Sequence, residues 1–254
     1  MKREKIFLKL LPLFVYLLLW EIFSVCVGDS LLFPTPAAVG KRFLQLLSEG
    51  EFYIFSFNTC KKVMTGFFSA LFMGSLSAFL AYKSRLFESF LKIPVMLMKA
   101  VPVAAYIIML FMLLPSSEIP AVISFIAVFP IVYSNLFDSL LKRDRNIYEM
   151  ADVFEIKGLK RFFYISLPES YNSLRTAVRL GIGTAFKASV ASEVITISSE
   201  TIGESFYNAK IYFDMAGLLA WTAGLVLITL IFEKAFLIIL NVFEKRLESG
   251  LKWI

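Results

Sequence analysis

The segment from Glu149 to Pro168, EMADVFEIKGLKRFFYISLP, is a charged stretch set between long apolar segments on both sides. Its charges alternate with apolar residues at the spacing of one or two short amphipathic helices. Aromatic side chains also occur where an ordinary solvated loop would carry Gly, Ser and Asn. Apolar residues exposed in this way indicate a groove on a partner. We therefore expect a partner outside the membrane to bind residues 145–168, called here the charged loop.

The composition of the 254-residue chain is that of a membrane protein. Hydrophobic residues make up 58% of it and charged residues 18%, whereas a soluble domain is roughly 45–50% apolar. Apolar runs of about 20 residues are long enough to cross a bilayer as helices. A β-barrel would show short alternating segments instead. The sequence therefore predicts an all-α membrane protein.

We predict a single transmembrane domain over residues 1–254 with six transmembrane helices. The expected spans are residues 6–27, 57–82, 95–114, 119–141, 171–197 and 215–242. The first run is longer than the roughly 7–15 apolar residues of a signal peptide, so we expect it to be retained. Pro94 and Pro102 are expected to bend the third span. Residues 37–47, which follow Pro34 and Pro36, are predicted to form a surface helix.

The distribution of cations predicts the orientation in the membrane, because Lys and Arg concentrate in cytoplasmic loops. The predicted outer segments hold few of them, namely Lys41, Arg42, Lys61, Lys62 and Lys210. We therefore place both termini and the charged loop in the cytoplasm, with the chain as a multi-pass protein of a cell membrane in contact with its lipids. The net charge of +6 does not indicate nucleic acid, since no basic stripe with stacking aromatics is present.

Several kinds of chemistry are excluded by residue type. The chain has no histidine, which removes the commonest general base and metal ligand. It also lacks the Gly-x-x-x-x-Gly-Lys-Ser/Thr loop that cradles phosphates, so it cannot hydrolyse ATP by itself. We expect no enzyme activity, no cofactor and no metal site. Cys26 and Cys60 both fall near predicted outer span ends, where a disulfide and two separate thiols are both possible.

The charged loop resembles the EAA loop of binding-protein-dependent ABC transporter permeases. Glu149, Ala151, Ile165, Leu167 and Pro168 keep the register of that motif. Residues 32–39, LFPTPAAV, resemble the Leu-Pro-Ser-Pro-x-x-Val signature of nitrate, sulfonate and taurine type permeases, and residues 99–102, KAVP, resemble their Arg-x-Ile-Pro element. The tail at residues 243–253 is also similar. Over nearly its whole length, the chain resembles the transmembrane subunit of a type I ABC importer.

This resemblance implies two permease copies, identical or related, that form a pathway. Two ATP-binding cassette ATPase subunits would bind the charged loops, and an extracytoplasmic solute-binding protein would deliver the solute. The ATPase-coupling residues it implies are Glu149, Ala151, Asp152, Glu155, Gly158, Ile165, Leu167 and Pro168. Glu155 occupies the position of the family's glycine, which normally supplies the bend between two short helices. The bend is therefore expected about one turn later, or the first helix is longer.

Lys187 and Glu193 are the candidate residues of the solute pathway. If the hydrocarbon region begins near Ala177, Lys187 lies roughly 15 Å inside it, close to the middle. A lone ammonium there needs a watery cavity or a carboxylate, so Lys187 is either a site for an anionic solute or part of a structural ion pair. Glu193 matches a glutamate common in the resembled family, and it is alternatively an interfacial carboxylate. Glu233 and Lys234 are expected to make contacts between helices.

The solute is not determined by the sequence. Lys187 favours a small anion such as a sulfonate or nitrate, and the alternative within the resembled family is a pyrimidine-type thiamine precursor or another vitamin-like solute. An ion-coupled secondary transporter would show internal repeats or a carboxylate cluster, and neither is visible. A membrane scaffold would need no polar residue such as Lys187 inside a span.

Overall fold

The computed structural model describes residues 2–29, 31–143, 145–156, 158–161 and 165–251. Over these ranges the regular elements are all helices and no strand occurs. In chain order they are α1 (Lys2–Val27), α2 (Pro36–Ser48), α3 (Gly50–Lys83), α4 (Arg85–Ala100), α5 (Val103–Phe111), α6 (Ile119–Leu141), α7 (Arg145–Val153), α8 (Gly158–Arg161), α9 (Leu167–Thr196), α10 (Ile202–Ile211) and α11 (Met215–Leu251). The all-α prediction is confirmed.

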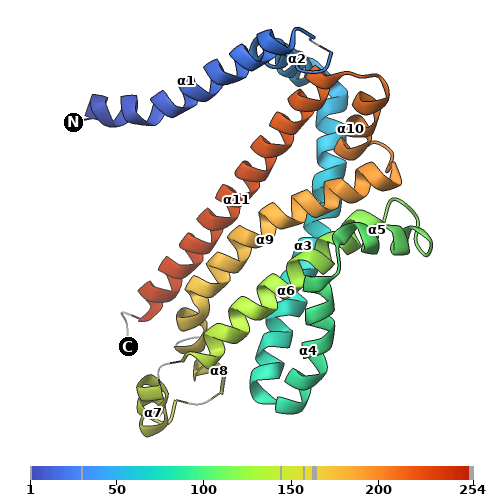
Figure 1. Ribbon diagram of the computed structural model, residues 1–254. Helices are drawn as coiled ribbons and strands as arrows, with labels where there is room; N and C mark the ends of the chain where they lie inside the picture. Colours follow the sequence, from blue (N-terminus) through green and yellow to red (C-terminus); the bar gives the residue numbers. More distant parts are fainter. Residues whose placement is uncertain (1, 30, 144, 157, 162–164, 252–254) are drawn as a thin grey trace.

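The core is built by α3, α6 and α9 (Figure 1). Glycines on α3 let α6 approach closely, because a Cβ on Gly66 would overlap the backbone of Ala121. The Ser124 hydroxyl on α6 donates to the Val63 carbonyl oxygen on α3 at 3.0 Å. Further along both helices, Gly74 lies against Val132. Residue numbers rise together on both helices, so α3 and α6 run in the same direction.

The third long helix of the core, α9, runs in the opposite direction. Its Ser189 hydroxyl donates to the carbonyl oxygen of Pro120, at the start of α6, at 3.1 Å. Earlier in α9, Gly181 packs against Val128 on α6. α11 covers another side of α9, where the Phe186 and Phe232 rings lie 5.8 Å apart. Alternating directions of this kind are those of a chain that crosses a membrane repeatedly.

The expected third span, residues 95–114, is interrupted at Pro102, one of the two prolines expected to bend it. α4 begins at Arg85, and the α4 and α5 axes are bent by 99° where they meet. Pro102 causes the break, because it has no N–H to continue the helix and it disfavours helical geometry at Val101 before it. Pro94 lies inside α4 without interrupting it. Because α3 and α6 are parallel, the broken pair α4–α5 is the segment that returns the chain between them.

Three described helical segments are long and apolar enough to cross a membrane by length and composition: Gly50–Lys83, Ile119–Leu141 and Met215–Val242. The broken pair α4–α5 would make a fourth span. α9, with 30 residues, is long enough, but its charges set it apart from these helices. In α1 the apolar part that qualifies by composition is the shorter stretch Phe14–Val27. The number of six spans therefore stays a prediction.

α1 and α2 lie at one end of the bundle (Figure 1). α1 reaches away from the other long helices, and Trp20 anchors it by donating to the Pro34 carbonyl oxygen at 3.0 Å. The predicted surface helix is present as α2: the Thr35 hydroxyl accepts from the Ala38 N–H, and Pro36 is its first residue. Cys26 and Cys60 are both free thiols. The tail residues 252–253 lie outside the described part.

Candidate coupling and pathway sites

The charged loop contains two short helices, α7 and α8, at the end of the bundle opposite α2 and α10 (Figure 1). α7 ends at Val153, and Glu155, two residues later, has a left-handed backbone with a φ of +55°. The Glu155 N–H donates to the Asp152 carbonyl oxygen at 3.1 Å, and the Ile156 N–H donates to that of Ala151 at 2.8 Å. This pair of bonds is the Schellman arrangement that glycine usually completes. The bend therefore lies at Glu155, where the resembled family has glycine.

The sequence left open a bend about one turn later or a longer first helix, and the structure has a second change of direction after Glu155. Gly158 also has a positive φ of +63°, and it begins α8 as a second change of direction. A non-glycine residue in the left-handed region costs roughly 1–2 kcal/mol. The hydrogen bonds around Glu155 hold it there, so the backbone geometry is kept without the glycine.

A tyrosine that the sequence did not single out braces the charged loop. The Tyr148 ring lies between two guanidinium groups, with Arg143 Cζ 5.0 Å and Arg161 Cζ 4.9 Å from its centroid. Its hydroxyl shares a 3.0 Å hydrogen bond with Ser166, just before α9. Burial is the largest cause that raises the pKa of the Tyr148 phenol, which stays neutral. Arg161 also forms an ion pair with Asp152, so α7 and α8 are joined.

The other predicted coupling residues occupy distinct places in this loop. Ala151 lies on the buried side of α7 and is fully buried. Glu149 and Gly158 are exposed, whereas Ile165 and Pro168 are half-buried. Leu167 and Pro168 form the first turn of α9, where proline is favoured. Leu167 is placed here only by its backbone.

α7 presents an apolar face to solvent. Val153 is 79% exposed and Phe154 70% exposed, and Ile147 and Met150 are also exposed. Positions 147, 150 and 154 lie on one side of a helix by their spacing of three and four residues. We call these four residues the α7 apolar face. An exposed apolar patch on a braced, charged loop has the character of a site that binds another protein.

Glu193 lies inside the protein and is fully buried. One of its carboxylate oxygens, Oε2, accepts hydrogen bonds from the Thr59 hydroxyl at 3.0 Å and from the Gly203 N–H at 3.2 Å. Thr59 in turn accepts from the Ile202 N–H at 3.0 Å. Glu193 therefore joins α3, α9 and the start of α10. The sequence suggested an interface or a pathway for it, whereas the structure places it among backbone donors and a buried hydroxyl.

A polar cavity of about 520 Å³ lies beside this junction. Its lining residues include Lys61, Lys62, Thr65, Ser117 and Glu118. The Lys62 ammonium donates to the Ser198 hydroxyl at 2.8 Å, and Ser198 donates to the Ser116 carbonyl oxygen at 3.2 Å. These bonds hold three segments together: α3, the turn before α6 and the turn after α9.

Lys187 lies on an exposed face of α9. Within the described ranges, no ion pair joins it to a carboxylate. The contacts of Ser189 with Pro120 and of Gly181 with Val128 place it level with the first two turns of α6. It therefore lies nearer the first turn of α6 than its middle. Lys187 is thus farther from the middle of the span than the sequence suggested.

Arg179, which precedes Lys187 on α9, does have a carboxylate partner. The Arg179 Nε atom on α9 donates to Glu233 Oε1 on α11 at 3.1 Å. The expected contact of Glu233 between helices is therefore present. Lys234 is exposed.

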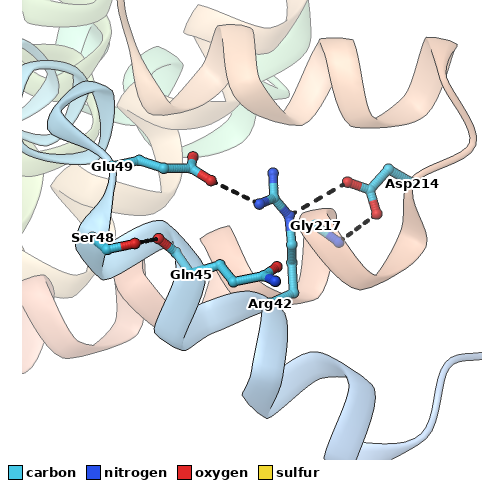
Figure 2. Close-up of polar contacts among 6 residues, drawn as sticks. All are labelled: Arg42, Gln45, Ser48, Glu49, Asp214 and Gly217. Carbon is cyan, nitrogen blue, oxygen red and sulfur yellow. Dashed lines mark hydrogen bonds and ion pairs between the residues drawn. The ribbon is translucent and has the colours of Figure 1, made fainter.

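An arginine clasp joins α2 to the starts of α3 and α11 (Figure 2). The Arg42 guanidinium on α2 lies 2.8 Å from Glu49 Oε1, between α2 and α3, and 3.9 Å from Asp214 Oδ2. Asp214 begins α11 by accepting the Gly217 N–H at 2.8 Å, and a Cβ on Gly217 would overlap its carboxylate. Partly exposed pairs like these contribute little energy each, so their role is to fix the positions of the helix ends.

Comparison with known proteins identifies relatives of this chain. The family described as "Binding-protein-dependent transport system inner membrane component" matches residues 70–249, which include the charged loop, Lys187 and Glu193. A probable ABC transporter permease protein of Brucella melitensis biotype 1 is 25% identical over 187 residues, 73% of this chain and 76% of that protein. The putative aliphatic sulfonates transport permease SsuC of Bacillus subtilis is 24% identical over 199 residues, 77% and 71% of the two chains. SsuC of Escherichia coli is 25% identical over 195 residues, 75% and 73%.

Proposed function

Because this chain belongs to the family of inner membrane components of binding-protein-dependent transport systems, we propose that it forms the pathway for a small organic anion such as an aliphatic sulfonate. It is the permease subunit of an ABC importer, embedded in a membrane. An ATPase and a solute-binding protein are the partners that this family implies. The proposal concerns the solute, the second permease copy and the residues that do the work.

Lys187 is the observation that carries the anion proposal. Its ammonium is exposed on α9 and has no carboxylate partner in the described part of the chain. Because Lys187 lies nearer the first turn of α6 than its middle, its long side chain can reach water from this exposed face of α9. A cation that lines a watery path attracts an anion. Two relatives are named as putative aliphatic sulfonates transport permeases, which supports the same class of solute.

The charged loop is the proposed ATPase-coupling site. The α7 apolar face supplies the contact surface, and Glu149, also exposed, lies among its residues in the sequence. α7 follows α6 closely in the chain, and Pro168 lies in the first turn of α9. The Tyr148 brace makes the loop rigid, so a push on α7 reaches the ends of both helices. ATP-driven closure of the ATPase pair would then tilt α6 and α9 between inward-open and outward-open arrangements.

At the opposite end, the layer of α2 and α10 is the proposed place where the extracytoplasmic solute-binding protein delivers the solute. Glu193 acts there as a positioning residue, since it fixes α10 to α3 and α9. Two copies of this chain, or this chain and a related one, would enclose the pathway. Both termini and the charged loop would lie in the cytoplasm, as the cation distribution favours.

Transport by the reconstituted complex tests the proposal. The permease is purified with its ATPase, placed in liposomes and supplied with the binding protein, and uptake of radiolabelled ethanesulfonate is measured. We expect Lys187→Met to abolish most uptake, Lys187→Arg to retain it, and the exposed control Lys234→Met to behave as the unaltered protein. Uptake at an unchanged rate in Lys187→Met, with an intact complex, would overturn the role of Lys187.

The solute class has its own test. Thermal unfolding of the cognate binding protein is measured with sulfonates, nitrate and pyrimidine-type thiamine precursors. Stabilisation by a sulfonate supports the proposal. Stabilisation by a pyrimidine alone would replace the anion with the vitamin-like solute.

A further inference from the structure

α4 has three different faces along its length. Leu86, Phe90, Ile93 and Leu97 are exposed and apolar. A second side, which includes Val95, packs into the core. The third side carries the charged residues of the helix interior, Glu88, Lys92 and Lys99, whose spacing of four and seven residues places them on one face. That face points away from the exposed apolar stripe.

The charged face of α4 borders a cavity of about 470 Å³ between α4 and α6. The lining residues are Glu88, Lys92, Val95, Met96, Lys99, Ala100, Tyr133, Ser134 and Phe137. The Lys99 ammonium donates to the Ser134 hydroxyl at 2.7 Å. In the described ranges, neither Lys92 nor Lys99 forms an ion pair with a carboxylate. Both cations therefore retain capacity to bind an added anion.

The opposite wall of this cavity is aromatic. On α6 the rings of Phe129, Tyr133 and Phe137 stack in a column, with interplanar angles of 4° and 8°. Tyr133 and Phe137 line the cavity itself. A site with ammonium groups on one wall and aromatic rings on the other fits a molecule with an acid group and an apolar body. An inorganic anion would contact the ammonium groups but would leave the aromatic wall without a partner.

The position of the cavity places it on the inner half of the pathway. α4 begins at Arg85, with one residue between it and the end of α3. This start lies at the end of the bundle where α7 and α8 lie (Figure 1). A span along α4 from Lys92 to Lys99 covers about 10 Å at 1.5 Å per residue. Because the apolar stripe of α4 is suited to lipid and two ammonium groups are not, the charged face is the side in contact with water.

We propose that the cavity between α4 and α6 binds the acid group of an organic anion on its way to the cytoplasm. Lys99 and Lys92 are successive sites for that group, and Tyr133 and Phe137 contact the apolar body. Glu88, nearest the inner end, repels the anion and favours its release. The identity of the ligand as the transported solute rests on the proposed function; the anion preference of the cavity does not.

Reaction of an introduced thiol tests the cavity directly. Cys26 and Cys60 are replaced with serine in the full complex, and Ala100→Cys, which lines the cavity, is treated in inverted membrane vesicles with an anionic or a cationic methanethiosulfonate of similar size. We expect the anionic reagent to react faster by about tenfold, the low end of the rise in local concentration that a charged cleft gives. Lys92→Met and Lys99→Met, separately, should each reduce that preference. Leu97→Cys, on the apolar stripe, is the control and should react with neither reagent.

Three outcomes would overturn the inference: no reaction at Ala100→Cys, equal reaction with both reagents, or a preference that survives both lysine substitutions. Because labelling does not depend on which solute is carried, these outcomes are separate from the proposed function. If ethanesulfonate is taken up but labelling shows no anion preference, the inference about the cavity is overturned and the proposed function stands. If labelling shows the anion preference but no sulfonate is taken up, the anion-binding cavity stands and the proposed solute is overturned.

Discussion

The Thr59 hydroxyl donates to Glu193 across 134 positions of sequence, at 3.0 Å and inside the protein. The same oxygen of Thr59 accepts the Ile202 N–H, and the same oxygen of Glu193 accepts the Gly203 N–H. One hydroxyl and one carboxylate thus satisfy the first backbone donors of α10. α3, α9 and α10 are fixed to one another by this junction, so under the proposed function it would limit how that side of the pathway opens.

Thr59→Val should destabilise the protein. Valine fills the space of threonine but leaves the Ile202 N–H and one hydrogen-bonding position of Glu193 without a partner, which costs about 1–3 kcal/mol when buried. Thermal unfolding of the purified complex measures the loss. Thr65→Val is the control, because the Thr65 hydroxyl is exposed and bonds only to the carbonyl oxygen of Lys61 on its own helix. Equal unfolding temperatures for the two variants would contradict the role of the junction.

Gly203→Ala should disrupt the same junction through its shape. The new methyl group would overlap the Glu193 side chain and the adjoining backbone of Val194, which cannot move away as a flexible side-chain end can. We expect a lower unfolding temperature and greatly reduced uptake. Gly183→Ala on α9 is the matched control, since its added methyl group meets nothing within 4 Å. The argument fails if both variants transport at the same rate.

Glu155→Gly should stabilise the charged loop. Glycine adopts the left-handed φ of this position without strain, so we expect a gain of about 0.5–1 kcal/mol, reduced by the greater freedom of the unfolded chain. ATPase binding should be retained, because the backbone is unchanged. Gly158→Ala is the opposite case, since its φ of +63° strains any side chain. Hydrogen exchange of residues 145–156 measures both effects, and greater protection in Gly158→Ala than in Glu155→Gly would contradict them.

Regular apolar segments were predicted well from the sequence. α6 covers Ile119–Leu141, the expected bounds, because a continuous apolar run between polar turns leaves little choice of ends. The third span was not predicted well. Pro94 and Pro102 look alike in sequence, yet only Pro102 ends a helix, at the point where the chain turns to reach α6. That turn depends on how α3, α4 and α6 pack, which no local pattern records.

The candidate sites were also predicted only in part from the sequence. The motif register located the charged loop, but residue type suggested a bend about one turn after Glu155 or a longer first helix. Hydrogen bonds from neighbouring residues instead place a left-handed residue at Glu155. The Tyr148 brace joins Arg143, Arg161 and Ser166, whose spacing shows no period. Glu193 was located as a residue of interest, but its partners Thr59 and Gly203 lie far away or beyond a turn. Contacts of this kind follow from the packed structure alone.

Under the proposed function, an ATPase binds the α7 apolar face and moves the helices through the braced loop. The most direct test is co-purification of the cognate ATPase with the double variant Val153→Ser, Phe154→Ser, since both side chains are exposed and their loss should leave the permease folded. Lys142→Ser, exposed at the end of α6, is the control. We predict that the double variant keeps its unfolding temperature, loses the ATPase and stops transport, while the control keeps all three properties. Full ATPase binding by the double variant would contradict the account.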